Sequence, residues 1–170
     1  MIHLRKIEPT DVPYLYRWEN DASVWADGSN HNPLSQQDLL DYVTSSTGDI
    51  FRDSQLRLII ELVVESQKSK VESIGCADLF DLDPRNRRAA IGLYIAPEYR
   101  GKGYATETLR LLEQYAFSFL HLRVLYAIVA AHNKPCSELF LNNGYTPSSL
   151  LPDWTLEGDA ILWTKTQKAL

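Results

Sequence analysis

A glycine-rich turn between an apolar run and a predicted helix is the segment of this sequence best suited to bind phosphate. The turn, Arg100-Gly101-Lys102-Gly103-Tyr104-Ala105, follows the apolar run Ala89–Ile95 and precedes the helix-like stretch Thr106–Leu120. Glycine lets a backbone turn without a Cβ penalty and approach a ligand closely. The first N–H groups of a helix have no partner within it and attract anionic oxygens. We therefore expect a phosphate-bearing ligand here, although a Gly-x-Gly turn can also serve packing alone.

Two common phosphate motifs do not fit this turn. In a P-loop, a glycine and four further residues precede a Gly-Lys pair, and Ser or Thr follows the lysine. This chain has Ala96 at the position of the first glycine and Gly103 after the lysine. A dinucleotide fingerprint ends on Gly or Ala, where this chain has Thr106, and needs an acid about 20 residues further on. The next predicted strand ends at His132 without one. Nucleotide binding of either type is not expected.

Two motifs in the second half of the chain resemble landmarks of the GCN5-related N-acetyltransferases (GNAT). The first is Arg-x-x-Gly-x-Ala at Arg100, Gly103 and Ala105, between a strand and a helix. The second is the stretch Asn133–Tyr145, in which an Asn, a short helix and a Gly-aromatic ending follow one another. The region from Leu56 to Tyr145 is also similar to the spermidine and ribosomal-protein acetyltransferase branch. The resemblance covers most of the chain.

The resemblance implies acetyl-CoA as co-substrate, with its pyrophosphate at the glycine-rich turn. Residues 92–95 would run beside the pantetheine arm and offer a backbone N–H to the tetrahedral oxyanion. Asn133 matches a cofactor-contacting Asn of the family, although an Asn before Pro135 also fits a helix N-cap. The residues implied to contact acetyl-CoA are Leu93, Tyr94, Ile95, Arg100, Gly101, Lys102, Gly103, Tyr104, Ala105, Asn133 and Phe140.

Acetyl transfer needs a proton taken from the attacking ammonium and one given to the leaving thiolate. Asp78 lies in the predicted strand Ile74–Leu82, at a position where the polyamine branch carries a Glu. The resemblance therefore implies that Asp78 acts as a base or as an anchor for the amine. A solvent-facing Asp is the alternative. Many family members protonate the thiolate with a Tyr where this chain has Phe140. Tyr94 or Tyr145 would then substitute, or solvent would protonate the sulfur. Without such an acid the chain can also be a non-catalytic acyl-CoA-binding or sensor module.

The acceptor is expected to be a small-molecule or peptide amine, namely a small amine, a polyamine or a protein N-terminus. Residues 1–83 carry 15 acidic and 7 basic side chains, whereas residues 84–170 carry 7 acidic and 10 basic ones. An acidic first half favours a cationic acceptor, although solvated surface charge gives the same count. The predicted loop Asp21–Pro33 is placed for acceptor recognition, yet its run Trp25–His31 lacks the paired carboxylates that would hold a polycation. The sequence therefore does not favour spermidine in particular.

Length and composition predict one soluble, cytoplasmic domain over residues 1–170. With 45% apolar residues the chain can bury one sizeable core, and it has neither an apolar run of about 18 residues nor a secretory signal. The net charge of −5 argues against nucleic acid. Cys76 and Cys136 fall in predicted elements and fit buried small hydrophobes, and we expect no metal site. Edge strands and the segment Trp154–Trp163 can support a homodimer or complete the monomer core.

The predicted elements place these residues on an α/β (α+β) fold. Period-two patterns and β-branched residues favour strands, whereas Ser35-x-x-Asp38 resembles a helix-starting capping box. We expect a single mixed, mostly antiparallel central sheet of about six or seven strands flanked by about four helices. Strands are predicted at Ile2–Ile7, Leu56–Val64, Ile74–Leu82, Ala89–Ile95, Val124–Val129 and Ala160–Lys165, and helices at Tyr14–Trp18, Ser35–Tyr42, Thr106–Leu120 and Pro135–Asn142.

Overall fold

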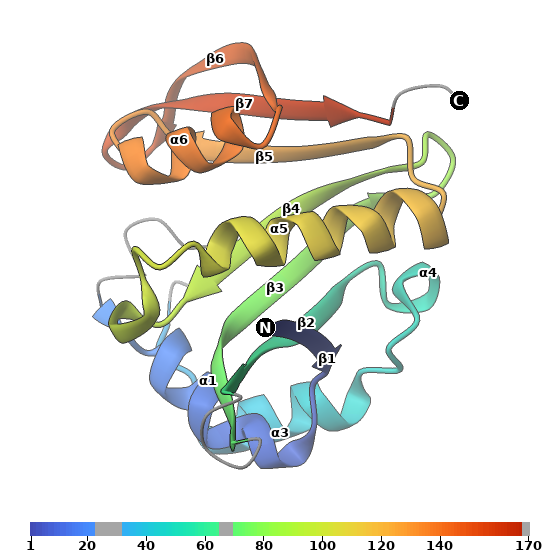
Figure 1. Ribbon diagram of the computed structural model, residues 1–170, viewed down its shortest axis with the longest axis vertical. Coiled ribbons are helices and arrows are strands. Elements are labelled where there is room, and N and C mark those ends of the chain that lie inside the picture. The colour runs from blue at the N-terminus through green and yellow to red at the C-terminus, as the bar shows by residue number, and fades with distance from the viewer. Residues whose placement is uncertain (23–31, 65–69, 168–170) are drawn as a thin grey trace.

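The computed structural model describes residues 1–22, 32–64 and 70–167 and builds them around one sheet. The strands are β1 (Ile2–Lys6), β2 (Leu56–Val64), β3 (Lys70–Asp83), β4 (Arg88–Ile95), β5 (Val124–Ala130), β6 (Thr146–Thr155) and β7 (Gly158–Thr166). The α-helices are α1 (Val12–Glu19), α3 (Gln36–Ser45), α4 (Ile50–Asp53), α5 (Tyr104–Gln114) and α6 (Lys134–Asn142). The seven strands run in the order β1-β2-β3-β4-β5-β7-β6 (Figure 1).

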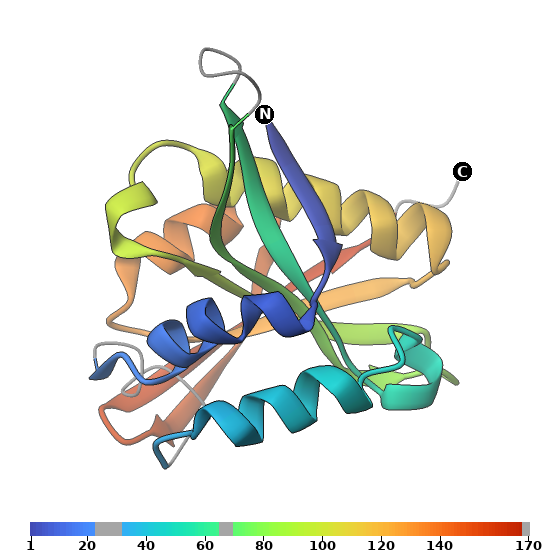
Figure 2. The same ribbon diagram turned by 90° about the horizontal axis from the view of Figure 1, so that it is seen from below.

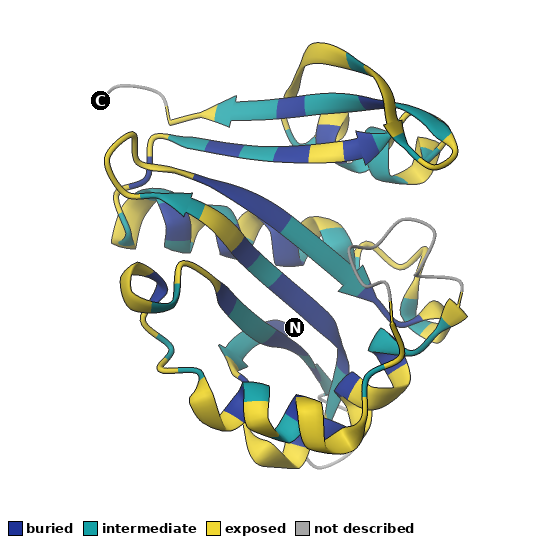
Figure 3. Cartoon of the chain, turned by 180° about the vertical axis from the view of Figure 1, so that it is seen from behind, coloured by how far each residue is buried: buried dark blue, intermediate teal, exposed yellow. Residues whose placement is uncertain are grey.

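Helices cover the two faces of the sheet unequally. Helices α5 and α6 lie on one face, and α1 and α3 on the other (Figure 2). The core is divided in the same way, since Leu109 and Leu112 of α5 pack in one apolar cluster and Leu15 and Leu39 of α1 and α3 in a second. Seen from behind, α1 and α3 leave β5 and β7 uncovered by any described helix (Figure 3). None of the described helices has the length and apolar character needed to cross a bilayer.

Strands β4 and β5 pair only at their first residues and then separate. Arg88–Ala90 lie opposite Val124–Tyr126 in the one parallel ladder among the described strands. Beyond that point β4 stays paired with β3 as far as Ile95, but no described residue of β5 pairs with it. Backbone groups of residues 91–95 on the β5 side therefore need partners other than a strand. The sheet opens at the end of β4 that leads toward α5 (Figure 1).

Gly75 allows β3 and β4 to approach closely beside this opening. A Cβ added at Gly75 would lie 2.0 Å from the carbonyl oxygen of Tyr94, which no side chain permits. The backbone N–H of Ala96 also donates to the carbonyl of Ile74 at 2.9 Å, which ties the end of β4 to β3. The path of β4 past the opening is thus set by its contact with β3.

The structure confirms the α+β fold, the mostly antiparallel sheet and every predicted strand and helix, with ends shifted by a few residues. Ser35 caps α3 as predicted, because its hydroxyl accepts from the N–H of Asp38 and the Asp38 carboxylate accepts from Ser35 in return. The long predicted helix ends its α-helical part at Gln114 and continues as one π-helical turn, Tyr115–Phe119. The reversal expected at Ser66–Lys70 lies largely outside the described residues.

One strand and one α-helix of the described residues were missed by the sequence patterns. Strand β6 carries Pro147 and Pro152, which read as turn residues; they are tolerated because β6 is an edge strand whose register with β7 is interrupted twice. The short helix α4 spans only four residues, and its start depends on the Asp49 carboxylate, which accepts from the N–H of Phe51 at 2.9 Å. A single capped turn of this kind has no apolar periodicity to reveal it.

Candidate active site

The glycine-rich turn forms an open cradle at the start of α5. Gly101 and Gly103 have φ angles of +72° and +81°, in the left-handed region that favours glycine. A Cβ added at either glycine would meet nothing within 4 Å. Gly103 is the N-cap, and the first helical hydrogen bond runs from the N–H of Glu107 to its carbonyl. The N–H groups of residues 104–106 therefore have no acceptor in the helix and can bind phosphate oxygens that enter this open space.

The two basic side chains of the turn bond to backbone carbonyls of the segment just before it. Nε of Arg100 donates to the carbonyl of Ile95 at 2.8 Å, and its guanidinium lies 5.7 Å from the ring centre of Tyr94. Nζ of Lys102 donates to the carbonyl of Glu98 at 2.9 Å and lies over the ring of Tyr99. Both positive charges belong to the turn that forms the cradle. A contribution of these charges to phosphate binding remains a prediction.

The residues of β4 past the opening alternate between the two faces of the sheet. Leu93 and Ile95 pack with the core under α5 and α6, whereas Tyr94 packs against α1, with its ring centre 5.8 Å from that of Trp18. Burial, followed by the charge of Asp21, raises the pKa of Tyr94. Tyr94 therefore keeps its proton at neutral pH and lies on the face opposite α5.

The second landmark is placed on α6 and the residues that follow it. The Asn133 side chain accepts from the N–H of Cys136 at 3.2 Å, so the helix-cap alternative is confirmed, and a cofactor contact from Asn133 remains a prediction. Phe140 is buried and meets the ring of Tyr145 edge-on at 4.9 Å. Gly144, at φ +81°, follows the helix in the left-handed conformation that is common after helix C-termini.

Tyr145 lies within the core on the α5 face. It is 2% exposed, and burial together with the charge of Glu113 on α5 raises its pKa well above the ordinary value. Nζ of Lys165 on β7 lies 5.5 Å from its ring centre. Its surroundings are thus α5, α6 and β7, whereas Tyr94 lies on the opposite face at the opening of the sheet.

Asp78 lies opposite Gly92 of β4, on the same face as Tyr94. A Cβ added at Gly92 would lie 3.5 Å from Oδ2 of Asp78, so the missing side chain leaves room for this carboxylate against β4. The next residue on this face, Cys76, lies opposite Tyr94. Burial raises the pKa of Cys76 to about 12, so this thiol is protonated at neutral pH and is not a nucleophile there.

Asp78 is not isolated, because Arg57 binds both of its oxygens. Arg57 Nε and Nη2 donate to Oδ1 and Oδ2 at 2.7 and 3.0 Å, and Nη1 donates to Glu19 at the end of α1. Burial opposes the charge of Arg57, yet the carboxylates raise its pKa well above its ordinary value. Sequence reasoning missed Arg57 and Glu19. An arginine in the apolar strand Leu56–Val64 was the available signal, since a buried charge needs a partner.

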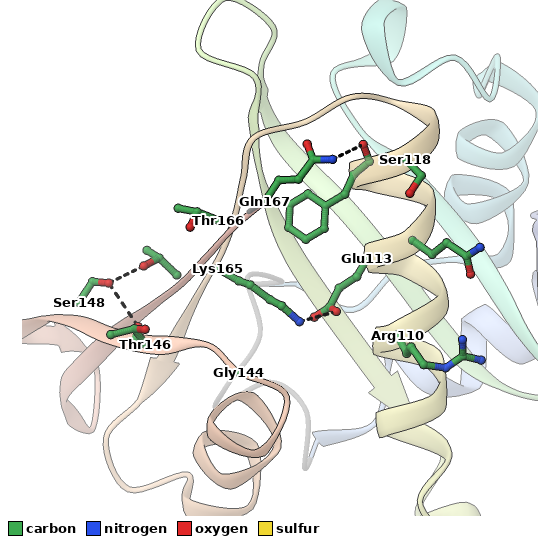
Figure 4. Close-up of a pocket in the computed structure, with 12 residues that line it drawn as sticks. Arg110, Glu113, Ser118, Gly144, Thr146, Ser148, Lys165, Thr166 and Gln167 are labelled. Carbon is green, nitrogen blue, oxygen red and sulfur yellow. Dashed lines mark hydrogen bonds and ion pairs between the residues drawn. The ribbon is translucent and has the colours of Figure 1, made fainter. Parts of the chain in front are cut away.

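Two cavities flank α5 away from the cradle. One, of about 750 Å³, lies between α5 and strands β6 and β7, where Lys165 bonds Glu113 and Gln167 bonds the carbonyl of Phe117 (Figure 4). The other, of about 820 Å³, lies between β1 and α5. Neither cavity is lined by a residue of the glycine-rich turn or of 93–95. The predicted acetyl-CoA site therefore lies outside both cavities, at the backbone cradle and the opening of the sheet.

Comparison with known protein families identifies the family to which this chain belongs. The family model described as "Acetyltransferase (GNAT) domain" matches residues 2–146. The chain belongs to the GNAT acetyltransferase family. The resemblance inferred from the two landmarks is thereby confirmed, and the chain is an N-acetyltransferase that uses acetyl-CoA as co-substrate. That the open cradle at Gly101 and Gly103 holds the pyrophosphate of that co-substrate remains a prediction.

Several proteins similar to this GNAT domain are spermidine acetyltransferases. Spermidine N(1)-acetyltransferase of Escherichia coli K12 is 29% identical over 148 residues, which cover 85% of this chain and 73% of the relative. The enzyme of the same name from Vibrio cholerae is 26% identical over 145 residues, which cover 84% and 77%. The solved structure of spermidine N-acetyltransferase from Vibrio cholerae with CoA and spermine has a TM-score of 0.85 at 21% identity, covering 98% of this chain and 95% of the other.

Proposed function

We propose that this enzyme acetylates a cationic primary amine that approaches from the α1 and α3 face of the sheet. The observation that carries the proposal is the separation of β5 from β4 after Ala90, next to the cradle at the start of α5. A thioester anchored by its pyrophosphate on the α5 side can reach through this opening, and an amine can attack it from the other side. Holding the two reactants at near-attack distance supplies much of the rate enhancement.

The acceptor side carries carboxylates suited to an ammonium group. Arg57 joins Glu19 and Asp78 on this face, and the charge of Asp21 acts on Tyr94. The names of the relatives place polyamines first among the acceptors to be tested. The loop Asp21–Pro33, which the sequence marks for acceptor recognition, lies mainly outside the described residues, and its run Trp25–His31 lies wholly outside them.

In the proposed reaction the amine nitrogen attacks the thioester carbonyl, the C–S bond breaks, and CoA leaves as a thiolate. Backbone N–H groups of residues 92–95 stabilise the oxyanion. Asp78 or water takes the ammonium proton, since such an amine has a pKa near 10. Tyr94, which holds its proton at neutral pH, gives one to the thiolate. Phe140 leaves no donor at the position where the family commonly has Tyr.

The two candidate acids are separated by a pair of matched variants. Tyr94→Phe is expected to lower kcat about a hundredfold, because a positioned acid contributes roughly 10² or more. Tyr145→Phe is expected to change kcat by less than about threefold, since Tyr145 is buried on the α5 face with its ring against Phe140. Single-turnover thiol release measures both. The reverse ranking would assign the acid to Tyr145, and two unaffected variants would assign protonation to solvent.

The acceptor is tested by thiol release with acetyl-CoA and a panel of spermidine, an aminoglycoside and a peptide with a free N-terminus. Release above the amine-free rate, with the acetylated product detected by mass spectrometry, is the expected result. Tight acetyl-CoA binding without release for any amine would favour the acyl-CoA-binding or sensor module, which the missing Tyr at Phe140 keeps as the second candidate.

A homodimer remains a prediction for this chain. Strand β6 is an edge of the sheet and exposes Leu150 and Trp154, each 58% accessible. An edge strand with exposed apolar side chains is a common pairing surface. A solved structure of the Vibrio cholerae spermidine enzyme is dodecameric, which supports testing for larger assemblies. Light scattering on the full chain measures the assembly directly.

A further inference from the structure

We infer that Arg57 determines acceptor specificity. Its guanidinium pairs with a carboxylate that would otherwise bind a second ammonium group of the acceptor. The inference rests on the proposed function and names its acceptor class: amines that present one positive charge to this face. Arg57 does not touch the reacting atoms in this proposal. It acts through Asp78, and it is therefore a positioning residue.

The geometry of the ion cluster supports this role. Nε and Nη2 of Arg57 hold both oxygens of Asp78, and Nη1 holds Glu19, so all three guanidinium nitrogens are engaged. The fork-shaped guanidinium matches a carboxylate in this bidentate manner, which a single ammonium cannot do. The side chains of Arg57, Asp78 and Glu19 are 22, 20 and 14% exposed. Partial burial strengthens such pairs relative to exposed ones.

Other elements fix Arg57 in place. Its strand partner is Asp78 itself, across the β2–β3 ladder, and the ring of Tyr42 on α3 lies 5.8 Å from its guanidinium carbon. An amine in solution must displace a cation that is covalently held beside its carboxylate at high effective concentration. Free amines at ordinary concentrations therefore do not take the place of Arg57.

The charge balance gives the specificity. The guanidinium of Arg57 offsets the negative charge of Asp78, so this carboxylate attracts a second ammonium less strongly than an unpaired carboxylate would. The Oδ2 atom of Asp78 lies against β4 at Gly92, on the side where the acceptor is proposed to enter. Without Arg57 this carboxylate would be unpaired and would bind a second ammonium of a diamine.

The test compares two acceptors of equal length that differ by one charge, 1-aminobutane and 1,4-diaminobutane. In Arg57→Gln the ratio of kcat/KM for the diamine to that for the monoamine is expected to rise about tenfold or more, the usual order for a charged hydrogen bond. In Arg57→Gln/Asp78→Asn the ratio is expected to return to the wild-type value, because the released carboxylate is gone. A ratio that stays unchanged in Arg57→Gln overturns the inference.

A matched control is provided by Arg5, which also bridges two carboxylates. Arg5 binds Asp11 through two nitrogens and Glu61 through Nε, but on β1, at the far side of β2 from Asp78. Arg5→Gln is expected to lose stability as Arg57→Gln does and to leave the acceptor ratio unchanged. A ratio that rises equally in both arginine variants would show a general effect of lost ion pairs and would overturn the inference.

Two further outcomes are interpretable. If Arg57→Gln does not fold, Arg57→Lys takes its place, because lysine keeps the charge but cannot bind both oxygens of Asp78. The ratio of kcat/KM for the diamine to that for the monoamine is then expected to rise about threefold. An unchanged ratio overturns the inference. Failure of the wild-type chain to release thiol with any amine would overturn both the proposed function and this inference. Wild-type turnover with an unmoved ratio would overturn the inference alone.

Discussion

Gly103→Asp is expected to weaken acetyl-CoA binding at least about a thousandfold, because like charges placed together cost several kcal/mol. Gly103 is the N-cap of α5, and a side chain there would extend into the open space in front of the first N–H groups. An Asp carboxylate would accept hydrogen bonds from those N–H groups, as N-cap residues do, and would repel the pyrophosphate. Isothermal titration calorimetry with acetyl-CoA measures the loss.

The same substitution is expected to leave the fold intact. The left-handed φ of +81° costs a non-glycine residue about 1 kcal/mol, and the new cap returns a similar amount. Gly144→Asp is the matched control, since Gly144 has the same φ of +81° and nothing within 4 Å of an added Cβ, but follows α6. It should bind acetyl-CoA as the wild type does. Unchanged affinity in Gly103→Asp would show that the cradle is not the pyrophosphate site.

Gly75→Ala is expected to lower the free energy of unfolding by about 3 kcal/mol, at the upper end for overpacking. The added Cβ would lie 2.0 Å from the backbone oxygen of Tyr94, and a backbone atom in a paired strand cannot rotate away as a side chain can. Strands β3 and β4 would have to separate beside the opening of the sheet. Urea unfolding followed by circular dichroism measures the change.

Gly92→Ala is the control for this prediction. Gly92 lies on β4, opposite Asp78, and the nearest atoms to an added Cβ are side-chain atoms of Asp78 and Phe80 at 3.4 Å. Its unfolding free energy should change by less than about 1 kcal/mol. If Gly75→Ala were as stable as Gly92→Ala, the close approach of β3 and β4 would not be what fixes the path of β4.

Local conformational signals made much of this protein predictable from its sequence. Glycines at 101 and 103 predicted a turn at a helix start, Ser35 and Asp38 predicted a capping box, and apolar runs predicted six of the seven strands. Each signal depends on residues that are neighbours in the chain, so its physical cause is visible in the sequence. The two family landmarks likewise consist of short contiguous stretches.

The tertiary structure alone decided the properties that depend on which distant segments meet. The pairs of Arg57 with Asp78 and Glu19 join residues 21 and 38 positions apart, and no local pattern marks such partners. Tyr94 and Tyr145 are equivalent candidates in the sequence, yet the alternation of β4 and the packing of α6 place them on opposite faces of the sheet. The reason is physical: turn and cap geometry is a property of a few bonded residues, whereas ion pairing and burial depend on how the whole sheet is assembled.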